Sequence, residues 1–235
     1  MRLCLAALAA SLALLTGCKS APGYPGNPPQ RPDQVMSFTA LYGQNCSACH
    51  GADGQYGPAF DLSNPQYQAL VSDATLRKTI DNGMPGSQMS AFAQSAGGML
   101  TDRQIDEIVY GMRKRWFKGN VLAGMNPPPY AQDKPGDAQR GAQVYKERCA
   151  ICHKPTPQEI TGPSYLALVA DQALRTMIIA GRPDIGQPDW RHDSPDGRLT
   201  TPLTAQDVDD IVTYLDSLRR PAVPAGPIAE SGSGR

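Results

Sequence analysis

The sequence is poor in the residues that build large cores, and its charge points to no particular partner. Of its 235 residues, 40% are apolar and 6% aromatic, with four Phe and two Trp. So few bulky side chains are a small supply for one ordinary core and a smaller one for two. The formal net charge is 0 and there is no basic stripe, so nothing indicates a nucleic-acid partner.

Alternating apolar and polar residues, which mark a half-buried strand, are also missing. Twenty-three Gly and 22 Pro indicate many turns and linkers. What remains is helical periodicity, which predicts helices over 34–47, 73–82, 101–116, 137–150, 171–180 and 204–219. We expect Thr101 and Thr204 to cap the last helix of each half, and Asp73 and Asp171 to cap the middle ones. The pattern predicts an all-α protein.

Long apolar runs are absent except at the N-terminus. Arg2 precedes an apolar stretch, Leu3 to Leu15, that has the form of an export signal and is too short for a permanent membrane span. It ends in the sequence LTGC, which resembles the lipobox of bacterial lipoproteins and implies cleavage of a signal peptide, 1–17, with acylation of Cys18. Several acyl chains anchor a protein firmly. We expect a lipid-anchored chain on the periplasmic side of a bacterial membrane, inner or outer.

Segments rich in Pro and Gly divide the rest of the chain. We interpret 18–33 as a tether, 119–136 as a linker and 221–235 as a disordered tail, which leaves domains over 34–118 and 137–220. The two domains are copies. The sequence CSACH at 46–50 recurs as CAICH 103 residues later, whereas Leu76-Arg77 recurs after 98 residues as Leu174-Arg175. A loop about five residues longer in the second copy restores the spacing.

Few chemistries fit two Cys-x-x-Cys-His motifs. A thioredoxin-like redox pair needs a βαβ setting, and a zinc site would draw ligands from two units and leave both His unexplained. Cys at positions i and i+3 lie on one side of a helical turn, where both sulfurs reach one haem edge, and His at i+4 lies under the iron. The motifs predict two covalently bound haem c groups, attached through Cys46, Cys49, Cys149 and Cys152, with His50 and His153 as iron ligands.

These features together resemble the class I cytochrome c family in a duplicated, dihaem form, over both predicted domains. The resemblance implies two tandem all-α domains, each wrapped around one haem. In that family a Pro carbonyl after the motif accepts a hydrogen bond from the proximal His, and Pro58 and Pro163 match that position.

The family also crosses its first and last helices where a small residue meets an aromatic one. The resemblance therefore implies that Gly141 meets Tyr214 in the second copy. In the first copy the partners are exchanged, and Phe38 is expected to meet Gly111. The total bulk at the crossing is the same in both.

The sixth iron ligand of the family, a Met in the second loop, matches only the first copy. Residues 83–92 resemble its Met-Pro-Ala-Phe loop, with Ser in place of Pro, and imply Met89 as the ligand. The matching position of the second copy is Gln187, whose amide is a poor ligand for haem iron. Three interpretations stay open: His192 completes bis-His ligation, the iron stays five-coordinate or binds water held by Gln187, or Met177 binds it from the middle helix.

The sequence has no substrate-binding fingerprint, no nucleotide loop and no acid–base constellation. The resemblance implies an electron carrier rather than an enzyme, acting between redox proteins of a respiratory or photosynthetic chain, as a shuttle or as a complex subunit. A competing hypothesis makes the second haem open, for peroxidase-like chemistry or gas binding. A third makes the chain a mainly structural subunit.

Overall fold

The computed structural model describes residues 30–132, 134–153, 159–191 and 201–219. The predicted signal peptide, Cys18, His192 and the tail lie outside these residues. The chain divides into two units, Met1–Val35 and Met36–Arg235, and the second contains both Cys-x-x-Cys-His motifs. None of the described helices has the length and apolar character needed to cross a membrane.

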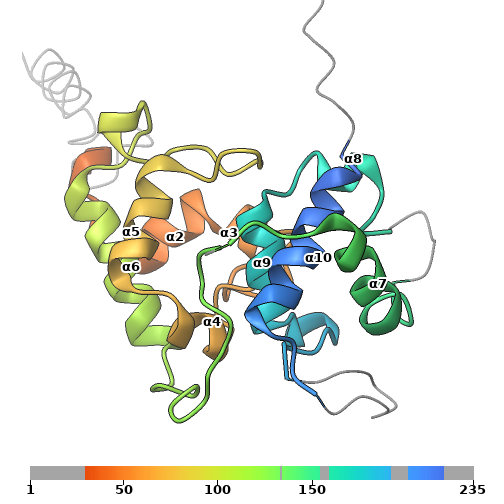
Figure 1. The fold of residues 1–235 in the computed structure, drawn as a ribbon. Coiled ribbons are helices and arrows are strands. Elements are labelled where there is room, and N and C mark those ends of the chain that lie inside the picture. Colours follow the sequence, from red (N-terminus) through yellow and green to blue (C-terminus); the bar gives the residue numbers. More distant parts are fainter. Residues whose placement is uncertain (1–29, 133, 154–158, 192–200, 220–235) are drawn as a thin grey trace, which may run out of the picture. The chain divides into compact units, whose positions relative to one another are not determined.

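Helices build the described part of this second unit, and no strand is found there beyond two isolated bridges (Figure 1). We call residues 36–118 the first lobe and 137–219 the second lobe. The first lobe contains α2 (Phe38–Asn45), α3 (Ser47–His50), α4 (Pro65–Leu70), α5 (Asp73–Asn82) and α6 (Asp102–Trp116). The second contains α7 (Ala138–Arg148), α8 (Pro163–Leu166), α9 (Asp171–Ala180) and α10 (Ala205–Ser217). The predicted all-α class is confirmed.

The caps of the last helices are as predicted, and those of the middle helices are not. Thr101 and Thr204 begin α6 and α10 with a capping box each. Ser72, not Asp73, caps α5, because it has the extended backbone of a cap and its hydroxyl accepts from the amide of Thr75 at 3.1 Å. Before α9 the cap position is Ala170, which has no capping side chain. Asp73 and Asp171 are the first helical residues instead.

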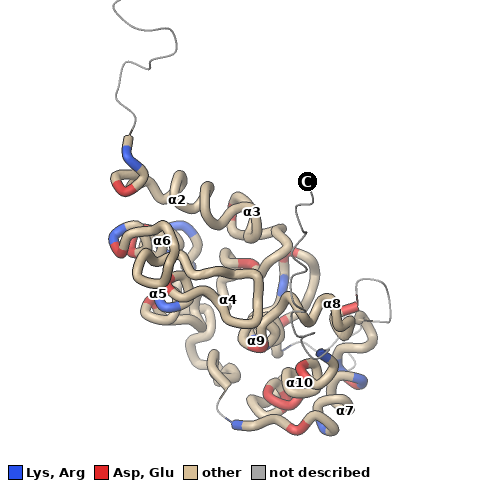
Figure 2. Tube along the Cα trace, turned by 90° about the horizontal axis from the view of Figure 1, so that it is seen from above, with Lys and Arg blue, Asp and Glu red and all other residues tan. Residues whose placement is uncertain are grey.

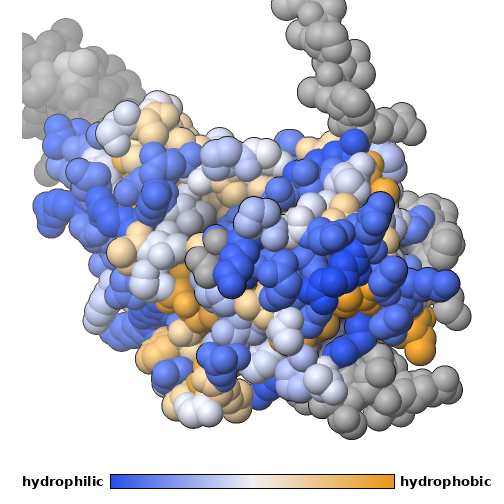
Figure 3. All heavy atoms as spheres, viewed as in Figure 1, coloured by the Kyte–Doolittle hydropathy of each residue, from blue (hydrophilic) through white to orange (hydrophobic). Residues whose placement is uncertain are grey.

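Each lobe has its own core, formed largely by its last helix. The apolar positions predicted from periodicity are buried: Ile105, Ile108, Val109 and Met112 on α6, and Val208, Ile211, Val212 and Leu215 on α10. The face of the molecule in Figure 3 is mainly hydrophilic, with apolar residues scattered over it. Acidic residues gather on α10, where Asp207 and Asp210 pair with Arg140 of α7 (Figure 2).

The first and last helices cross where the sequence predicts. A Cβ added at Gly111 of α6 would overlap the ring of Phe38 on α2. A Cβ added at Gly141 of α7 would overlap the backbone of α10 beside Tyr214. Both pairings, including the exchanged one in the first lobe, are confirmed.

Both lobes contain an equivalent set of arginine contacts, which the spacing of the sequence repeat does not reveal. In the first lobe, Arg113 donates to the carbonyls of Gln68 and Val71 and pairs with Asp73 at 2.7 Å. In the second, Arg219 donates to the carbonyls of Leu166 and Val169 and pairs with Asp171 at 2.6 Å. The accepting residues of the two lobes keep the 98-residue spacing, whereas the two arginines do not. The same set of contacts is therefore made by arginines at non-equivalent positions of the two copies.

The predicted linker is packed against the second lobe. Arg175 of α9 is 2% exposed, pairs with the buried Asp209 of α10 and donates to the carbonyls of Pro129 and Tyr130 at 3.0 and 3.1 Å. Gln172 also donates to Tyr130, at 2.8 Å. These bonds fix the end of the linker on α9.

Candidate haem sites

Both Cys-x-x-Cys-His motifs follow a helix and continue as a helical turn. The amide of His50 donates to the carbonyl of Cys46 at 3.0 Å, and that of His153 to Cys149 at 2.9 Å. Such a turn places the side chains at i, i+3 and i+4 on one side. Burial raises the pKa of the Cys46 thiol to about 12 and of Cys149 to about 11, so neither resembles a reactive redox thiol.

The ring of His50 is oriented by a backbone carbonyl, but not the predicted one. Its Nδ1 lies 2.7 Å from the carbonyl oxygen of Phe60. The expected acceptor was Pro58. The amide of the next residue, Ala59, donates to Cys49 at 2.8 Å, and with the chain held there it is the Phe60 carbonyl that reaches the ring. Such a bond leaves Nε2 as the nitrogen available to a metal.

Burial favours the neutral form of both motif histidines. Burial is the larger cause that lowers the pKa of His50, and the charge of Arg182 adds to it against the opposing Phe60 carbonyl. Burial alone lowers the pKa of His153. A neutral imidazole is the form that binds a metal.

Pro163 has a different place from Pro58. It is the first residue of α8, with Gly162 as the cap. At the 98-residue spacing that relates α5 to α9, it corresponds to Pro65, the first residue of α4. The predicted match between Pro58 and Pro163 is therefore out of register, and a hydrogen bond from His153 to Pro163 stays a prediction.

The two second loops share a backbone hydrogen bond at the same position, and it makes Gln187 the counterpart of Met89. The amide of Met84 donates to the carbonyl of Met89 at 2.9 Å, and that of Arg182 to Gln187 at 3.0 Å. Each loop begins with a glycine at positive φ, Gly83 at 69° and Gly181 at 73°, where added side-chain atoms would meet the loop backbone.

A further backbone hydrogen bond joins the end of each loop to the residue before the last helix region. The amide of Leu100 donates to Phe92 at 2.8 Å, and that of Leu203 to Trp190 at 2.9 Å. Leu100 follows Phe92 by eight positions and Leu203 follows Trp190 by 13, which places the extra residues of the second copy between Trp190 and Leu203. The predicted longer loop is confirmed there.

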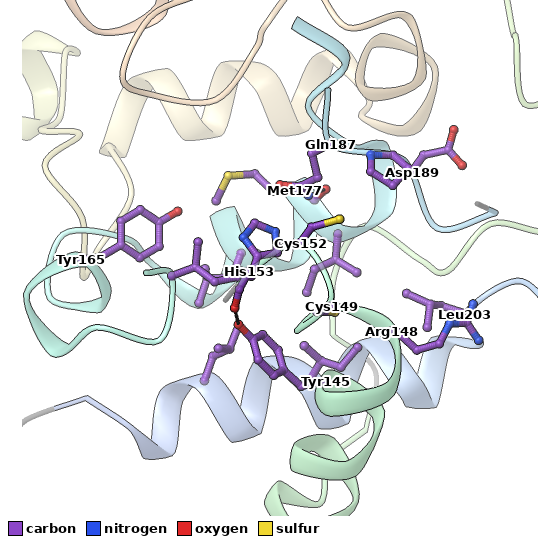
Figure 4. A pocket seen from close by; sticks show the side chains of 16 residues that line it. Tyr145, Arg148, Cys149, Cys152, His153, Tyr165, Met177, Gln187, Asp189 and Leu203 are labelled. Atoms are coloured by element: carbon purple, nitrogen blue, oxygen red, sulfur yellow. Dashed lines mark hydrogen bonds between the residues drawn. The ribbon is translucent and has the colours of Figure 1, made fainter. Parts of the chain in front are cut away.

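A pocket in the second lobe has the lining that a haem requires. Cys149, Cys152 and His153 lie on one side, and Figure 4 shows the ring of His153 facing Met177 and Gln187. Apolar side chains complete the lining, among them Ile160, Leu174, Ile178, Ile211 and Leu215. The residues fit the predicted group.

Of the three residues considered as the sixth ligand of the second iron or as the holder of its water, Gln187 and Met177 line this pocket. Gln187 donates from Nε2 to the carbonyl of Met177 at 2.9 Å. Because its amide nitrogen is engaged, Oε1 is the end of Gln187 that can meet a group bound in the pocket. Met177 lines the same wall from α9.

One pair of residues near the motifs was missed by sequence reasoning. The hydroxyl of Tyr42 donates to the carbonyl of Gly51 at 2.9 Å, and that of Tyr145 to His153 at 3.5 Å. Both tyrosines are buried. They lie 103 residues apart, so the spacing of the repeat could have revealed them.

Two all-α lobes, each with a Cys-x-x-Cys-His turn that follows its first helix and a second loop, the distal loop, after its middle helix, define a c-type cytochrome. Comparison with protein families agrees. Residues 33–110 match the family of cytochrome c oxidase, cbb3-type, subunit III, and residues 138–219 match cytochrome c. The chain belongs to the class I cytochrome c family as a duplicated member, and its two domains carry two covalent haem c groups with iron.

Curated relatives cover parts of the chain. The cbb3-type cytochrome c oxidase subunit CcoP of Azospirillum sp. is 32% identical over 130 residues, 51% of this chain and 39% of the relative. Dihydro-heme d1 dehydrogenase of Pseudomonas aeruginosa is 39% identical over 70 residues, 30% and 13% of the two chains. Subunit FixPc of Rhizobium leguminosarum bv. viciae is 27% identical over 128 residues, 51% and 39%. The chain thus spans at most about two fifths of these relatives' length.

A solved structure, the Kuenenia stuttgartiensis reducing HAO-like protein complex Kustc0457/Kustc0458, is also similar. It aligns over 78% of this chain and 96% of its own, with 16% identity and a TM-score of 0.44.

Proposed function

We propose that this chain is an electron carrier of a respiratory or photosynthetic system and that it performs no substrate chemistry of its own. The observation that carries the proposal is the repeated site: each lobe has a histidine on a helical turn and a second loop closed by an equivalent backbone hydrogen bond, Met84 to Met89 or Arg182 to Gln187. An iron enclosed between such ligands exchanges electrons without binding a substrate. The similarity to oxidase subunits supports a place beside, or within, a larger redox complex.

The residues of this chain then have distinct roles. Cys46, Cys49, Cys149 and Cys152 attach the two haems, and His50 and His153 ligate their irons. Bound haem supplies the one-electron chemistry. Phe60 orients His50 through its carbonyl, and Met89 completes the ligand set of the first haem. Met ligation raises a reduction potential above that given by two nitrogen ligands.

We further propose that the chain is anchored by lipid at Cys18 on the periplasmic side of a bacterial membrane. The support is the form of the N-terminal sequence. Such an anchor holds the haems beside membrane-bound donors or acceptors. Mass spectrometry of the membrane-extracted protein tests it: acylated Cys18 at the N-terminus supports the anchor, and an unmodified N-terminus excludes it.

The electron-transfer proposal is tested on the purified holoprotein. Haem is quantified per chain, and absorption spectra are taken in a redox titration. We expect two covalent haems that titrate reversibly, with the absorption band of Met–iron ligation coming from half the iron. Fewer than two haems, or haems that do not exchange electrons with a soluble mediator, would refute it.

A second candidate function rests on one observation, the presence of Gln187 where the first lobe has Met89. If no side chain binds the second iron, that haem is open to a diatomic gas or to peroxide. Carbon monoxide binding at one haem of the reduced protein, or peroxidase turnover, favours this function. Absence of both excludes it.

A further inference from the structure

The two copies differ at positions where one lobe contacts the other. Five polar residues lie there, and their counterparts at the 98-residue spacing are small or apolar. Asn64 and Gln66 correspond to Gly162 and Ser164, Arg182 and Asp184 to Met84 and Gly86, and Asp189 to Ala91. Because the counterparts hold a haem loop without these side chains, the five residues are not needed for the haem fold itself.

Asn64 links the first lobe to the start of the second lobe's distal loop by hydrogen bonds, and we call each such hydrogen-bonded contact between the lobes a tie. It is 1% exposed and its Oδ1 caps α4, accepting from the amides of Gln66 and Tyr67. Its Nδ2 donates to the carbonyls of Ala180 and Gly181, at 2.9 and 3.2 Å. One buried amide therefore serves the end of a helix in each lobe.

Arg182 and Asp184 make a second tie, to the segment that follows the first haem motif. Their side chains are 6% and 0% exposed and pair at 2.8 Å. Arg182 donates to the carbonyl of Gly57 at 3.3 Å, while Asp184 accepts from the amide of Tyr56 at 3.1 Å. Tyr56 has a φ of 63°, an unfavourable conformation for a bulky residue, so external support is expected there.

The third tie lies at the other end of the loop. Gln66 donates from Nε2 to a carboxylate oxygen of Asp189 at 2.5 Å, and Arg191 holds the same carboxylate. The loop between these ties contains Gln187, whose backbone pairs with Arg182 at 3.0 and 2.9 Å. Its start and its end are thus both held by the first lobe.

We propose that Asn64 and Gln66, with Arg182 and Asp184, are positioning residues for the distal side of the second haem, so that access to the second iron is set by the first lobe. The inference rests on the proposed function in requiring a bound second haem. On this proposal the loop covers the distal side of that iron, and the rate at which a ligand enters follows the population of the open loop. Removing a tie raises that population.

The test is carbon monoxide association with the fully reduced holoprotein, followed by stopped flow, together with the potential of each haem. Gln66→Ala removes one tie. Asn64→Ser keeps a hydroxyl that can cap α4 but is too short to reach Ala180. Arg182→Gln breaks the pair with Asp184. Arg77→Gln is the control, since it breaks Arg–Asp pairs that lie inside the first lobe, with Asp81, Asp102 and Asp106.

We expect association at the second haem to become about tenfold faster in each tie variant, with its potential shifted and the Met89 band of the first haem unchanged. Arg182→Lys, which keeps the charge beside Asp184, should recover part of the effect. Unchanged association and potential in both Gln66→Ala and Asn64→Ser, with two haems bound, would overturn the inference. If Arg182→Gln does not retain both haems, the inference is judged on Gln66→Ala and Asn64→Ser alone. Fewer than two haems in the parent protein counts against the proposed function instead.

Discussion

Replacing Gln187 by Met should give the second haem the ligand set of the first. The backbone of the two loops is equivalent at this position, since Met84 pairs with Met89 as Arg182 pairs with Gln187. The two side chains are of similar length, so the thioether of Gln187→Met can occupy the space that the amide now fills.

The cost in stability should be small. The substitution removes the hydrogen bond from Gln187 to the carbonyl of Met177, worth about 0.5–1.5 kcal/mol. That carbonyl still accepts from the amide of Gly181 at 3.0 Å, so it is not left without a partner. The thioether also buries more apolar surface, which offsets part of the loss.

The assay is the absorption band of Met–iron ligation in the oxidised protein, with a redox titration. Its amplitude per chain should double in Gln187→Met, the potential of the second haem should rise, and any carbon monoxide binding to it should cease. Met89→Gln is the mirror variant and should remove the band. A band still arising from half the iron in Gln187→Met would refute the placement of this residue opposite His153.

Three further predictions concern stability. Arg175→Met should lower the free energy of unfolding by about 3–5 kcal/mol, since it leaves the carboxylate of Asp209 buried without its partner; denaturant unfolding measures this, and a loss below 1 kcal/mol would contradict it. Gly111→Ala should cost about 1–3 kcal/mol through overlap with the ring of Phe38, and the double variant with Phe38→Ala should cost less than the sum of the two single losses. Backbone amides at the start of α7 lower the pKa of Asp137, so its charge stabilises the fold above the unfolded pKa of about 3.9 and less as pH falls below it; in Asp137→Asn, which can still cap the helix, acid unfolding should depend less steeply on pH, and equal slopes would contradict this.

Much of the fold could be predicted because the repeat and the helical periodicity agree. Helices 73–82 and 171–180 were predicted to the residue, and the glycine–aromatic crossings followed from the family resemblance. The cap of α5 was misassigned because Ser72 and Asp73 are adjacent and both can cap, and the cap predicted for α9 was wrong because Ala170 stands at that position. Only the backbone geometry distinguishes Ser72 from Asp73.

The site was less predictable from sequence. The carbonyl that orients His50 belongs to Phe60, and a carbonyl carries no signal in a sequence, since any residue supplies one. Pro163 was matched to Pro58 through a shared Gly-Pro dipeptide, whereas its position at the start of α8 corresponds to Pro65. The side chains that cross between lobes, such as Asn64, depend on tertiary contacts about 116 residues apart in the chain.

The packed linker has a kinetic consequence. A slack linker would let the two haem domains sample many separations, and their effective concentration would be an average over all of them. The bonds from Arg175 and Gln172 to Pro129 and Tyr130 shorten the free part of the connection and remove much of that averaging. Because one chain would carry both haems, exchange of an electron between them would be unimolecular and independent of dilution, and the fixed linker would narrow it toward a single rate.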